Sequence, residues 1–273
     1  MKITGLFIYP VKSLGAVPLE ESEIGIRGLF YDRQWMLVKP DGSMITQREF
    51  PEMALFKIEN LPEHFQIRPT HKTQSPLLLE KNGGESGEKL SVKIWNDTAE
   101  ALCMNPVYDE WFSEILETNC RLVKMPPDGT RKHIFEKFGE KNDLNFPDSK
   151  PLLITNELSL EALNGRAKYP VPMDRFRPNI VFRGLNAFEE DGWNEFGIGE
   201  NRFKMIKPCG RCIITTIDQQ TAEKGKEPLK TLKTFRLENN NTLFGMYARF
   251  VPAAGAHSAH IRRGDKIAEF DTK

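Results

Sequence analysis

The sequence predicts a mainly β fold with a few helices, which places it in the α+β class. Short runs rich in β-branched and aromatic residues recur along the chain, separated by turn-forming residues. Two other stretches space their apolar residues as amphipathic helices do. The length of 273 residues corresponds to roughly two domains of about 150 residues, which can bury a core without disulfide or metal cross-links.

The first strands are predicted close to the start of the chain. Residues 3–10, ITGLFIYP, form a short apolar run that ends at a proline. Residues 33–47 predict a hairpin around a turn at residues 39–42. In that turn Pro40 suits the second position, and Gly42 can adopt a positive φ.

The next stretches alternate between strand and loop. Residues 89–97, KLSVKIWND, alternate well enough to predict another strand. Residues 72–89 are rich in Gly, Ser, Lys and Glu, and predict a solvated loop with one short strand at 76–80. Residues 128–150 are polar and predict a long surface loop, a feature that is usually functional or mobile. We suggest residues 136–145 of this loop as a segment of the substrate pocket.

Two helices are predicted in the middle of the chain. Residues 105–118 carry apolar side chains near helical spacing with acidic residues between them. Residues 155–166 begin with Thr155 or Asn156 as an N-cap and end at Asn164-Gly165. We place the domain boundary at the first of these helices, which gives domains at residues 1–120 and 121–273.

The composition excludes several classes of function. Lys and Arg number 38, as do Asp and Glu, so the net charge is zero. Binding to nucleic acid or to an anionic membrane usually requires a basic excess, and we expect neither partner. The longest apolar runs fall far short of the ~20 residues that span a bilayer, and no targeting segment is visible. Four scattered cysteines indicate a reducing compartment, so we expect a cytoplasmic protein.

Residues 173–184, MDRFRPNIVFRG, combine an apolar face with a cationic one if the segment is extended. Alternate residues of an extended segment share a face, so one face would carry Arg175, Arg177 and Asn179. Two guanidinium groups beside an amide suit a phosphate, which arginine binds bidentately. Ordinary surface ion pairs are the alternative, and this segment alone does not decide between them.

The segment KPCGRCIITT places Cys209 and Cys212 three residues apart. Zinc normally needs four protein ligands, and the sequence has no second pair of this kind. A redox dithiol usually begins a helix, whereas the residues after Cys212 are β-branched and predict a strand. Two buried cysteines acting as small apolar groups remain an alternative. In the fourth interpretation, one of the two thiolates binds a metal whose other ligands include sulfur atoms from outside this segment. The positive charge of Arg211 would favour the ionised form of that thiol.

Five motifs, in order and at matching spacing, resemble a single family. They are IYPVKSL, YDRQWMLV, DRFRPNIVF, KPCGRCIITTID and EPLKTLKTFR with LFGMYARF. The chain is similar to MOSC-domain proteins of the amidoxime-reducing type over nearly its whole length. The resemblance implies a MOSC β-barrel preceded by an N-terminal β-barrel-like region.

The resemblance also implies a cofactor and the residues that hold it. The cofactor of that family is the molybdenum cofactor, Mo-molybdopterin, a pterin with dithiolene sulfurs and a terminal phosphate. Cys212 would be the metal ligand and the catalytic residue, and Cys209 a structural neighbour. Lys150 stands where related members can carry serine, so its backbone N–H is the group implied. The implied cofactor-binding residues are Lys12, Ser13, Arg33, Ser149, Lys150, Arg175, Arg177, Asn179, Arg211, Cys212 and Tyr247.

The activity implied is the two-electron reduction of small N-hydroxylated compounds, namely amidoximes, hydroxylamines and N-hydroxylated bases. No cysteine follows Cys212, so we expect no internal iron–sulfur cluster. Electrons would come from a separate ferredoxin, cytochrome or flavoprotein reductase. The alternative is a carrier of the cofactor, or a sulfur-handling MOSC module without turnover. A pyridoxal-phosphate module is not expected, because the chain is too short and offers no lysine in such a context.

Overall fold

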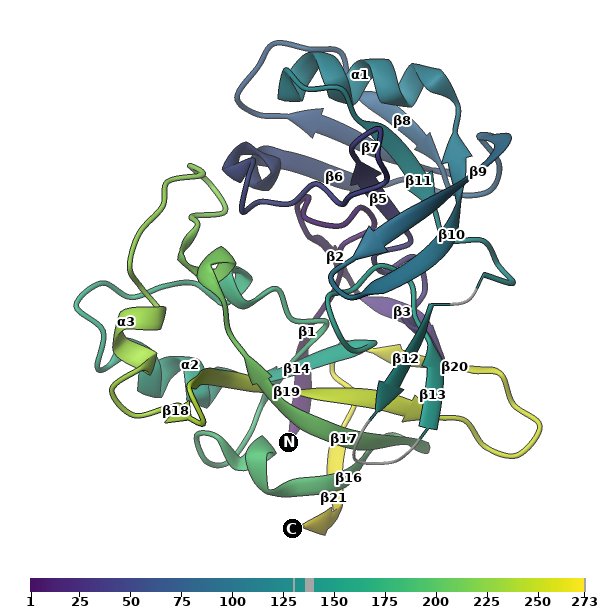
Figure 1. The fold of residues 1–273 in the computed structure, drawn as a ribbon. Helices are drawn as coiled ribbons and strands as arrows, with labels where there is room; N and C mark the ends of the chain where they lie inside the picture. Colours follow the sequence, from purple (N-terminus) through teal and green to yellow (C-terminus); the bar gives the residue numbers. More distant parts are fainter. Residues whose placement is uncertain (130, 136–139, 273) are drawn as a thin grey trace.

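Strands make up most of the molecule. The computed structural model describes residues 1–129, 131–135 and 140–272, which contain three α-helices and many strands (Figure 1). The predicted α+β class is therefore confirmed. Within these residues no helix has the length and the apolar character required to cross a membrane.

A nine-stranded sheet forms the lower half of the molecule in Figure 1. Its order is β2-β1-β15-β14-β19-β17-β16-β21, with β18 paired to β19. β1, predicted from the apolar run at 3–10, pairs with β15 far along the chain. The strands are β1 (Lys2–Ile8), β2 (Val17–Leu19), β14 (Leu152–Asn156), β15 (Ile180–Arg183), β16 (Trp193–Ile198), β17 (Asn201–Gly210), β18 (Leu237–Glu238), β19 (Asn241–Val251) and β21 (Ile267–Thr272).

Smaller sheets form the upper half and the junction between the halves (Figure 1). A four-stranded sheet has the order β5-β11-β10-β9, and a three-stranded sheet has the order β6-β7-β8. A further sheet, β20-β3-β4, joins the ends of the chain, and β12 pairs with β13. These strands are β3 (Glu21–Gly25), β4 (Gly28–Leu29), β5 (Trp35–Val38), β6 (Phe56–Asn60), β7 (His64–Pro69), β8 (Leu77–Glu80), β9 (Glu85–Ile94), β10 (Asp97–Met104), β11 (Arg121–Lys124), β12 (Lys132–Phe135), β13 (Glu140–Asp143) and β20 (Ser258–Arg262).

The predicted hairpin around the turn at residues 39–42 is confirmed, although its paired part is short. Gly42 has φ +80° and donates its N–H to the Lys39 carbonyl at 2.9 Å. The arms are joined by an antiparallel bridge between Val38 and Met44 and by backbone hydrogen bonds from residue 39 to 43 and from residue 45 to 37. The first arm, β5, also pairs with β11, a long-range partner that the sequence did not predict.

Two predicted loops contain more strand than expected. Residues 85–89 belong to β9, which pairs with β10 along its length, although their composition predicted solvated loop. Within 128–150, β12 and β13 pair with each other. Residues 85–89 (ESGEK) carry no apolar side chain, and β12 and β13 have only four residues each, so hydrophobic periodicity does not detect them.

Both predicted helices are confirmed, and the cap of the second is Asn156, one of the two residues expected there. α1 (Pro106–Leu116) has Asn105 as N-cap, and α2 (Glu157–Asn164) has Asn156, whose side chain accepts the Leu158 N–H at 3.0 Å. The sequence did not predict α3 or the four 3-10 helices. These are α3 (Leu229–Leu232), η1 (Pro51–Leu55), η2 (Met173–Phe176), η3 (Glu189–Gly192) and η4 (Ile213–Thr216).

One buried apolar cluster runs through both halves of the molecule. It includes Trp35 and Phe112 from the upper half and Phe182 and Phe203 from the nine-stranded sheet. Strand pairing also crosses residue 120, because β11 lies in the sheet of β5 and β1 lies in the sheet of β15. The division into domains at 1–120 and 121–273 stays a prediction.

The core face of α1 provides a test of this packing. Phe112 is 0% exposed, and its ring centroid lies 4.9 Å from that of Trp111 and 5.9 Å from that of Phe56. Phe112→Ala should lower the free energy of unfolding by about 3–5 kcal/mol, because it removes buried contacts and leaves a cavity. Val107→Ala on the exposed face of the same helix should change it by less than about 0.5 kcal/mol. Denaturant unfolding measures both, and equal effects would contradict the packing.

Candidate active site

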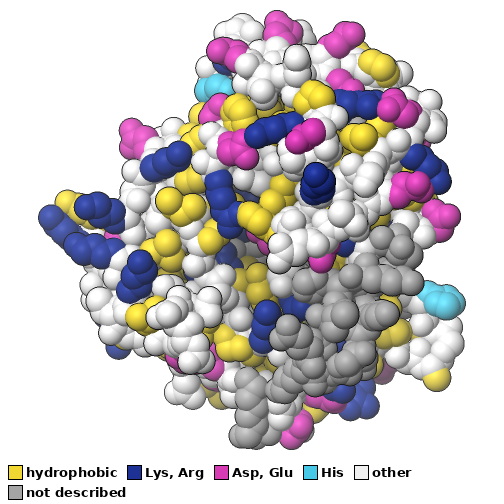
Figure 2. Space-filling model, viewed as in Figure 1, with side chains coloured by type: hydrophobic (Ala, Val, Ile, Leu, Met, Phe, Trp, Pro, Cys, Tyr) yellow, Lys and Arg dark blue, Asp and Glu magenta, His cyan; other side chains and the backbone are white. Residues whose placement is uncertain are grey.

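A pocket lies where segments distant in sequence meet, among them those after β1, before β5, before β14, before β15 and after β17. Figure 2 shows Lys and Arg side chains around a hollow on this face. Every cofactor-binding residue expected from the sequence, apart from Arg175, lines the pocket. Those residues are Lys12, Ser13, Arg33, Ser149, Lys150, Arg177, Asn179, Arg211, Cys212 and Tyr247.

The pocket has a strong excess of positive charge. Its lining contains five cationic side chains and one carboxylate, in a chain with zero net charge. The cations are Lys12, Arg33, Lys150, Arg177 and Arg211, and the carboxylate is Asp148. Like charges at close range in a poorly solvated site repel one another, so this arrangement favours an anionic ligand.

Three of the lining residues adopt left-handed backbone. Ser13, Arg33 and Arg177 have φ values of 70°, 46° and 53°. This region is uncommon for residues with a side chain, and it typically occurs where the surrounding structure holds a functional geometry. The sharp turns direct these side chains into the pocket from three separate segments.

Arg33 and Arg177 both lie against the ring of Tyr9. Their guanidinium carbons are 4.1 and 4.2 Å from its centroid. Burial, together with the charge on Arg33, lowers the pKa of Arg177 to about 10, although Tyr9 opposes this. Burial also raises the pKa of Tyr9 to about 12, so its hydroxyl remains protonated and donates to the Pro178 carbonyl. An anion beside Arg177 would relieve this electrostatic cost.

Lys12 and Asp148 form the only ion pair that joins two lining residues among the described residues. The Lys12 Nζ is 2.5 Å from an Asp148 oxygen and 2.9 Å from the Phe146 carbonyl. Burial lowers the pKa of Lys12, and Asp148 only partly offsets this. Burial works to raise the pKa of Asp148, but Lys12 and the Trp95 N–H outweigh it and hold that pKa below its ordinary value.

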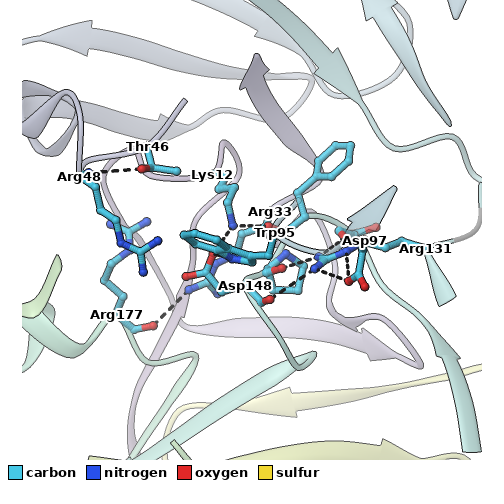
Figure 3. Close-up of polar contacts among 12 residues, drawn as sticks. Lys12, Arg33, Thr46, Arg48, Trp95, Asp97, Arg131, Asp148 and Arg177 are labelled. Carbon is cyan, nitrogen blue, oxygen red and sulfur yellow. Dashed lines mark hydrogen bonds and ion pairs between the residues drawn. The ribbon is translucent and has the colours of Figure 1, made fainter. Parts of the chain in front are cut away.

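The loop that carries Ser149 and Lys150 is held from the upper half of the molecule (Figure 3). Arg131, which is 1% exposed, forms an ion pair with Asp97 at 2.9 Å. It also donates to the carbonyls of residues 145, 147 and 148. At the tip of the β9–β10 hairpin the indole of Trp95 donates to Asp148 at 3.2 Å. A side of the pocket is therefore fixed by contacts between the halves.

Arg131, Trp95 and Asp148 were not predicted as site residues. Their importance depends on contacts with residues 14 to 136 positions away. Asp148 could have been noticed, because it directly precedes Ser149 in the expected cofactor loop. Within the suggested substrate segment 136–145, residues 136–139 lie outside the described residues.

The two cysteines of the pair have different environments. Cys209 is 1% exposed, and its sulfur accepts a hydrogen bond from Arg211 Nη1 at 2.7 Å. Cys212 is partly exposed and lines the pocket. Among the described residues no three or more His, Cys, Asp or Glu side chains form a group that could hold a metal ion. This arrangement favours the interpretation in which one thiolate faces a bound group.

One expectation about this region is wrong. Residues 213–216 form η4 instead of a strand, because the chain turns after Cys212 and Thr215 donates its N–H to the Cys212 carbonyl at 3.1 Å. The charge of Arg211 acts on both sulfurs, and its hydrogen bond goes to Cys209. The cysteines and Tyr247 raise the pKa of Arg211 against the effect of burial, so this guanidinium stays charged beside both sulfurs.

The expected cationic face of 173–184 is only partly present. Residues 173–176 form η2, so Arg175 does not share a face with Arg177. Arg175 instead forms an ion pair with Asp218 at 2.7 Å, outside the pocket. Asn179 is buried, and its side chain accepts the Leu153 N–H and donates to the Phe7 carbonyl. This amide joins β14 to β1 at the base of the pocket.

The donor set fits an anionic group that also carries a metal. Arg211 Nε is buried without a hydrogen-bond partner, and the hydrogen bond of Arg177 to Gln219 is long at 3.4 Å. Buried polar groups normally have partners, so these donors have capacity for a ligand. A phosphate suits the guanidinium groups, and a soft metal suits the thiol of Cys212.

These features define a two-lobed β protein with a cationic, thiol-bearing pocket between its lobes. Family models agree with this architecture: the MOSC N-terminal beta barrel domain matches residues 1–119, and the MOSC domain matches residues 141–268. The chain belongs to the family of MOSC-domain amidoxime-reducing components, as the five sequence motifs indicated.

Relatives at moderate identity support this membership. The mitochondrial amidoxime-reducing component 1 of Xenopus laevis is 34% identical over 272 residues, covering 90% of this chain and 76% of the relative. The mitochondrial amidoxime reducing component 2 of Homo sapiens is 36% identical over 245 residues, covering 86% and 72%. The solved YUAD protein of Bacillus subtilis aligns with 99% of this chain and 96% of its own at 10% identity, but its TM-score of 0.45 is too low to support an argument.

Arg175 and Arg177 provide a matched test of the pocket. Arg177→Ala should weaken the binding of inorganic phosphate to cofactor-free protein by about 10- to 100-fold, because it removes a charged hydrogen bond worth roughly 1.5–3 kcal/mol. Arg175→Ala should leave phosphate affinity unchanged, because that guanidinium is paired with Asp218 outside the pocket. Calorimetric titration measures both. Equal losses in the two variants would contradict the assigned geometry.

Proposed function

We propose that this protein is a molybdenum cofactor-dependent oxidoreductase that reduces N-hydroxylated compounds. The observation that carries the proposal is the position of Cys212, whose thiol shares one pocket with five cationic side chains. The names of the relatives, which describe amidoxime-reducing components, support the substrate class.

The pocket divides into two regions that suit the two ends of the cofactor. Lys12, Arg33 and Arg177 would hold the phosphate, since three cations converge there and, among the described residues, only two of them have carboxylate partners, Asp148 and Asp32. At the other end, Cys212 would supply the metal ligand. The bound cofactor supplies two-electron redox chemistry at its metal.

Arg211 and Tyr247 define the electrostatics around the thiol. Arg211 donates to Cys209 and to the Phe176 carbonyl, so its positive charge is fixed beside the sulfurs. Burial, with a contribution from Cys209, raises the pKa of Tyr247 well above its ordinary value. The Tyr247 hydroxyl therefore keeps its proton at neutral pH and acts as a hydrogen-bond donor at the site.

The overall reaction consumes two electrons and two protons for each N–O bond cleaved, and releases water. We propose that the electrons come from a separate ferredoxin, cytochrome or flavoprotein reductase. We also propose a cytoplasmic location, which the four free cysteines support because thiols persist in reducing compartments.

Cysteine variants test the proposal directly. Protein produced in a host that makes the cofactor should contain about one molybdenum per chain, as the single thiolate at Cys212 implies. Cys212→Ser should lose the reduction of an N-hydroxylated base by an artificial electron donor, because the thiolate ligand is gone. Cys209→Ser should keep most of this activity. Metal analysis and a reductase assay measure the two quantities.

Two outcomes would contradict the proposal. Equal loss of activity in both variants would favour a dithiol. Full molybdenum content without turnover of any N-hydroxylated compound would favour a cofactor carrier or a sulfur-handling module.

A further inference from the structure

A second pocket adjoins the first and has a different chemical character. Ser149, Gly210 and Tyr247 line both pockets, so the two share a boundary next to the segment that carries Cys212. The remaining residues of this second pocket are Lys207, Pro208, Glu238, Asn239, Asn241 and Leu243. None of these six lines the cofactor pocket.

Regular hydrogen bonding builds this second pocket. In the β18–β19 hairpin Glu238 pairs with Asn241, and the tip residues Asn239 and Asn240 have φ values of 47° and 62°. Positive φ at both positions is typical of a tight two-residue hairpin turn. The Asn241 side chain donates to the Asn239 carbonyl at 3.2 Å and stabilises this turn. The hairpin therefore holds Glu238 in a defined position at the edge of the nine-stranded sheet (Figure 1).

The facing wall comes from an irregular part of β17. The pairing of β17 with β19 shifts register between Met205 and Lys207, and again between Pro208 and Gly210. Bulges of this kind redirect side chains and often occur beside active sites. They place Gly210 near Asn241, since a Cβ at Gly210 would lie 3.4 Å from the Asn241 side-chain oxygen.

The charges of the second pocket are available to a ligand. Glu238 and Lys207 are both exposed, and neither has an ion-pair partner in the described part of the chain. The cofactor pocket is dominated by cations, whereas this pocket offers one carboxylate, one ammonium group, two asparagines and the hydroxyls of Ser149 and Tyr247. A small planar group that presents N–H donors would find acceptors here and would be repelled from the first pocket if it carried positive charge.

We propose that the second pocket is the substrate subsite and that Glu238 binds the N–C–N group of amidoxime-type substrates. This rests on the proposed reductase function. In the reaction R–C(NH2)=N–OH gains two electrons from the external donor protein and two protons, its N–O bond breaks, and water and R–C(NH2)=NH are released. The amidine then takes a further proton from solvent and becomes a cation. A carboxylate that accepts its N–H groups binds this cation more strongly than the neutral substrate.

Binding measurements test the subsite without turnover. Wild-type protein, with and without cofactor, should bind benzamidine roughly ten-fold or more tightly than neutral benzamide, since the charged hydrogen bonds are made only with benzamidine. Glu238→Gln should abolish this preference. Glu223→Gln, which neutralises an exposed glutamate outside both pockets, should retain it. Lys207→Gln should bind benzamidine at least as tightly as wild type, because a like charge has been removed.

Steady-state kinetics provide the second measurement. Glu238→Gln should raise KM for benzamidoxime by roughly ten-fold or more with little change in kcat, while KM for N-phenylhydroxylamine, which lacks the N–C–N group, stays the same. Unchanged molybdenum content and melting temperature would show that the fold and cofactor are intact. Wild-type affinity for benzamidine in Glu238→Gln would overturn the subsite. A preference for benzamidine that depends on Glu238, in protein that reduces no N-hydroxylated compound, would support the subsite and contradict the proposed function.

Discussion

Repulsion among buried cations at the junction of the two halves is the constraint on which the site depends. Arg33 and Arg177 lie against one tyrosine ring, and burial lowers the pKa of both Arg177 and Lys12. Asp148, paired with Lys12, and Asp32, paired with Arg33, compensate only part of this charge. Clustered cations without a bound anion destabilise the junction between the two halves. Binding of an anionic group is therefore coupled to the stability of the junction. The positive charge therefore explains both the location and the chemistry of the pocket.

The architecture maintains this arrangement through contacts between distant segments. The first cation, Lys12, follows β1, a strand that Asn179 joins to β14. From the other half, Trp95 contacts the loop before β14 directly, and Asp97 pairs with Arg131, which donates to that loop. Left-handed backbone at Ser13, Arg33 and Arg177 then directs side chains inward. Because neither half builds the pocket alone, cofactor binding would be sensitive to substitutions in either half.

Sequence patterns predicted what is local and missed what is long-range. The cap of α2, expected at Thr155 or Asn156, and the turn at Gly42 depend on neighbouring residues, and both were predicted. The β-branched run after Cys212 suggested a strand, but the chain turns there into η4 because the pocket lies at the end of β17. The sequence does not distinguish Arg175 from Arg177. The backbone geometry of η2 directs Arg175 to an ion pair with Asp218 and Arg177 into the pocket. Glu238 had no motif at all, since its role depends on a hairpin packed beside β17.

The two adjoining pockets differ in their charged groups, and this difference matches the proposed chemistry. The cationic pocket suits a cofactor that is anionic at one end and metal-bearing at the other, and the pocket beside it suits a neutral substrate whose product is a cation. Cys212 lies in the first pocket, and Tyr247 separates it from the second.

The most direct test of the central claim is X-ray absorption at the molybdenum edge of loaded protein. The account predicts that Cys212→Ser loses one sulfur ligand relative to wild type while Cys209→Ser retains all of them. Identical spectra for wild type and Cys212→Ser would contradict it.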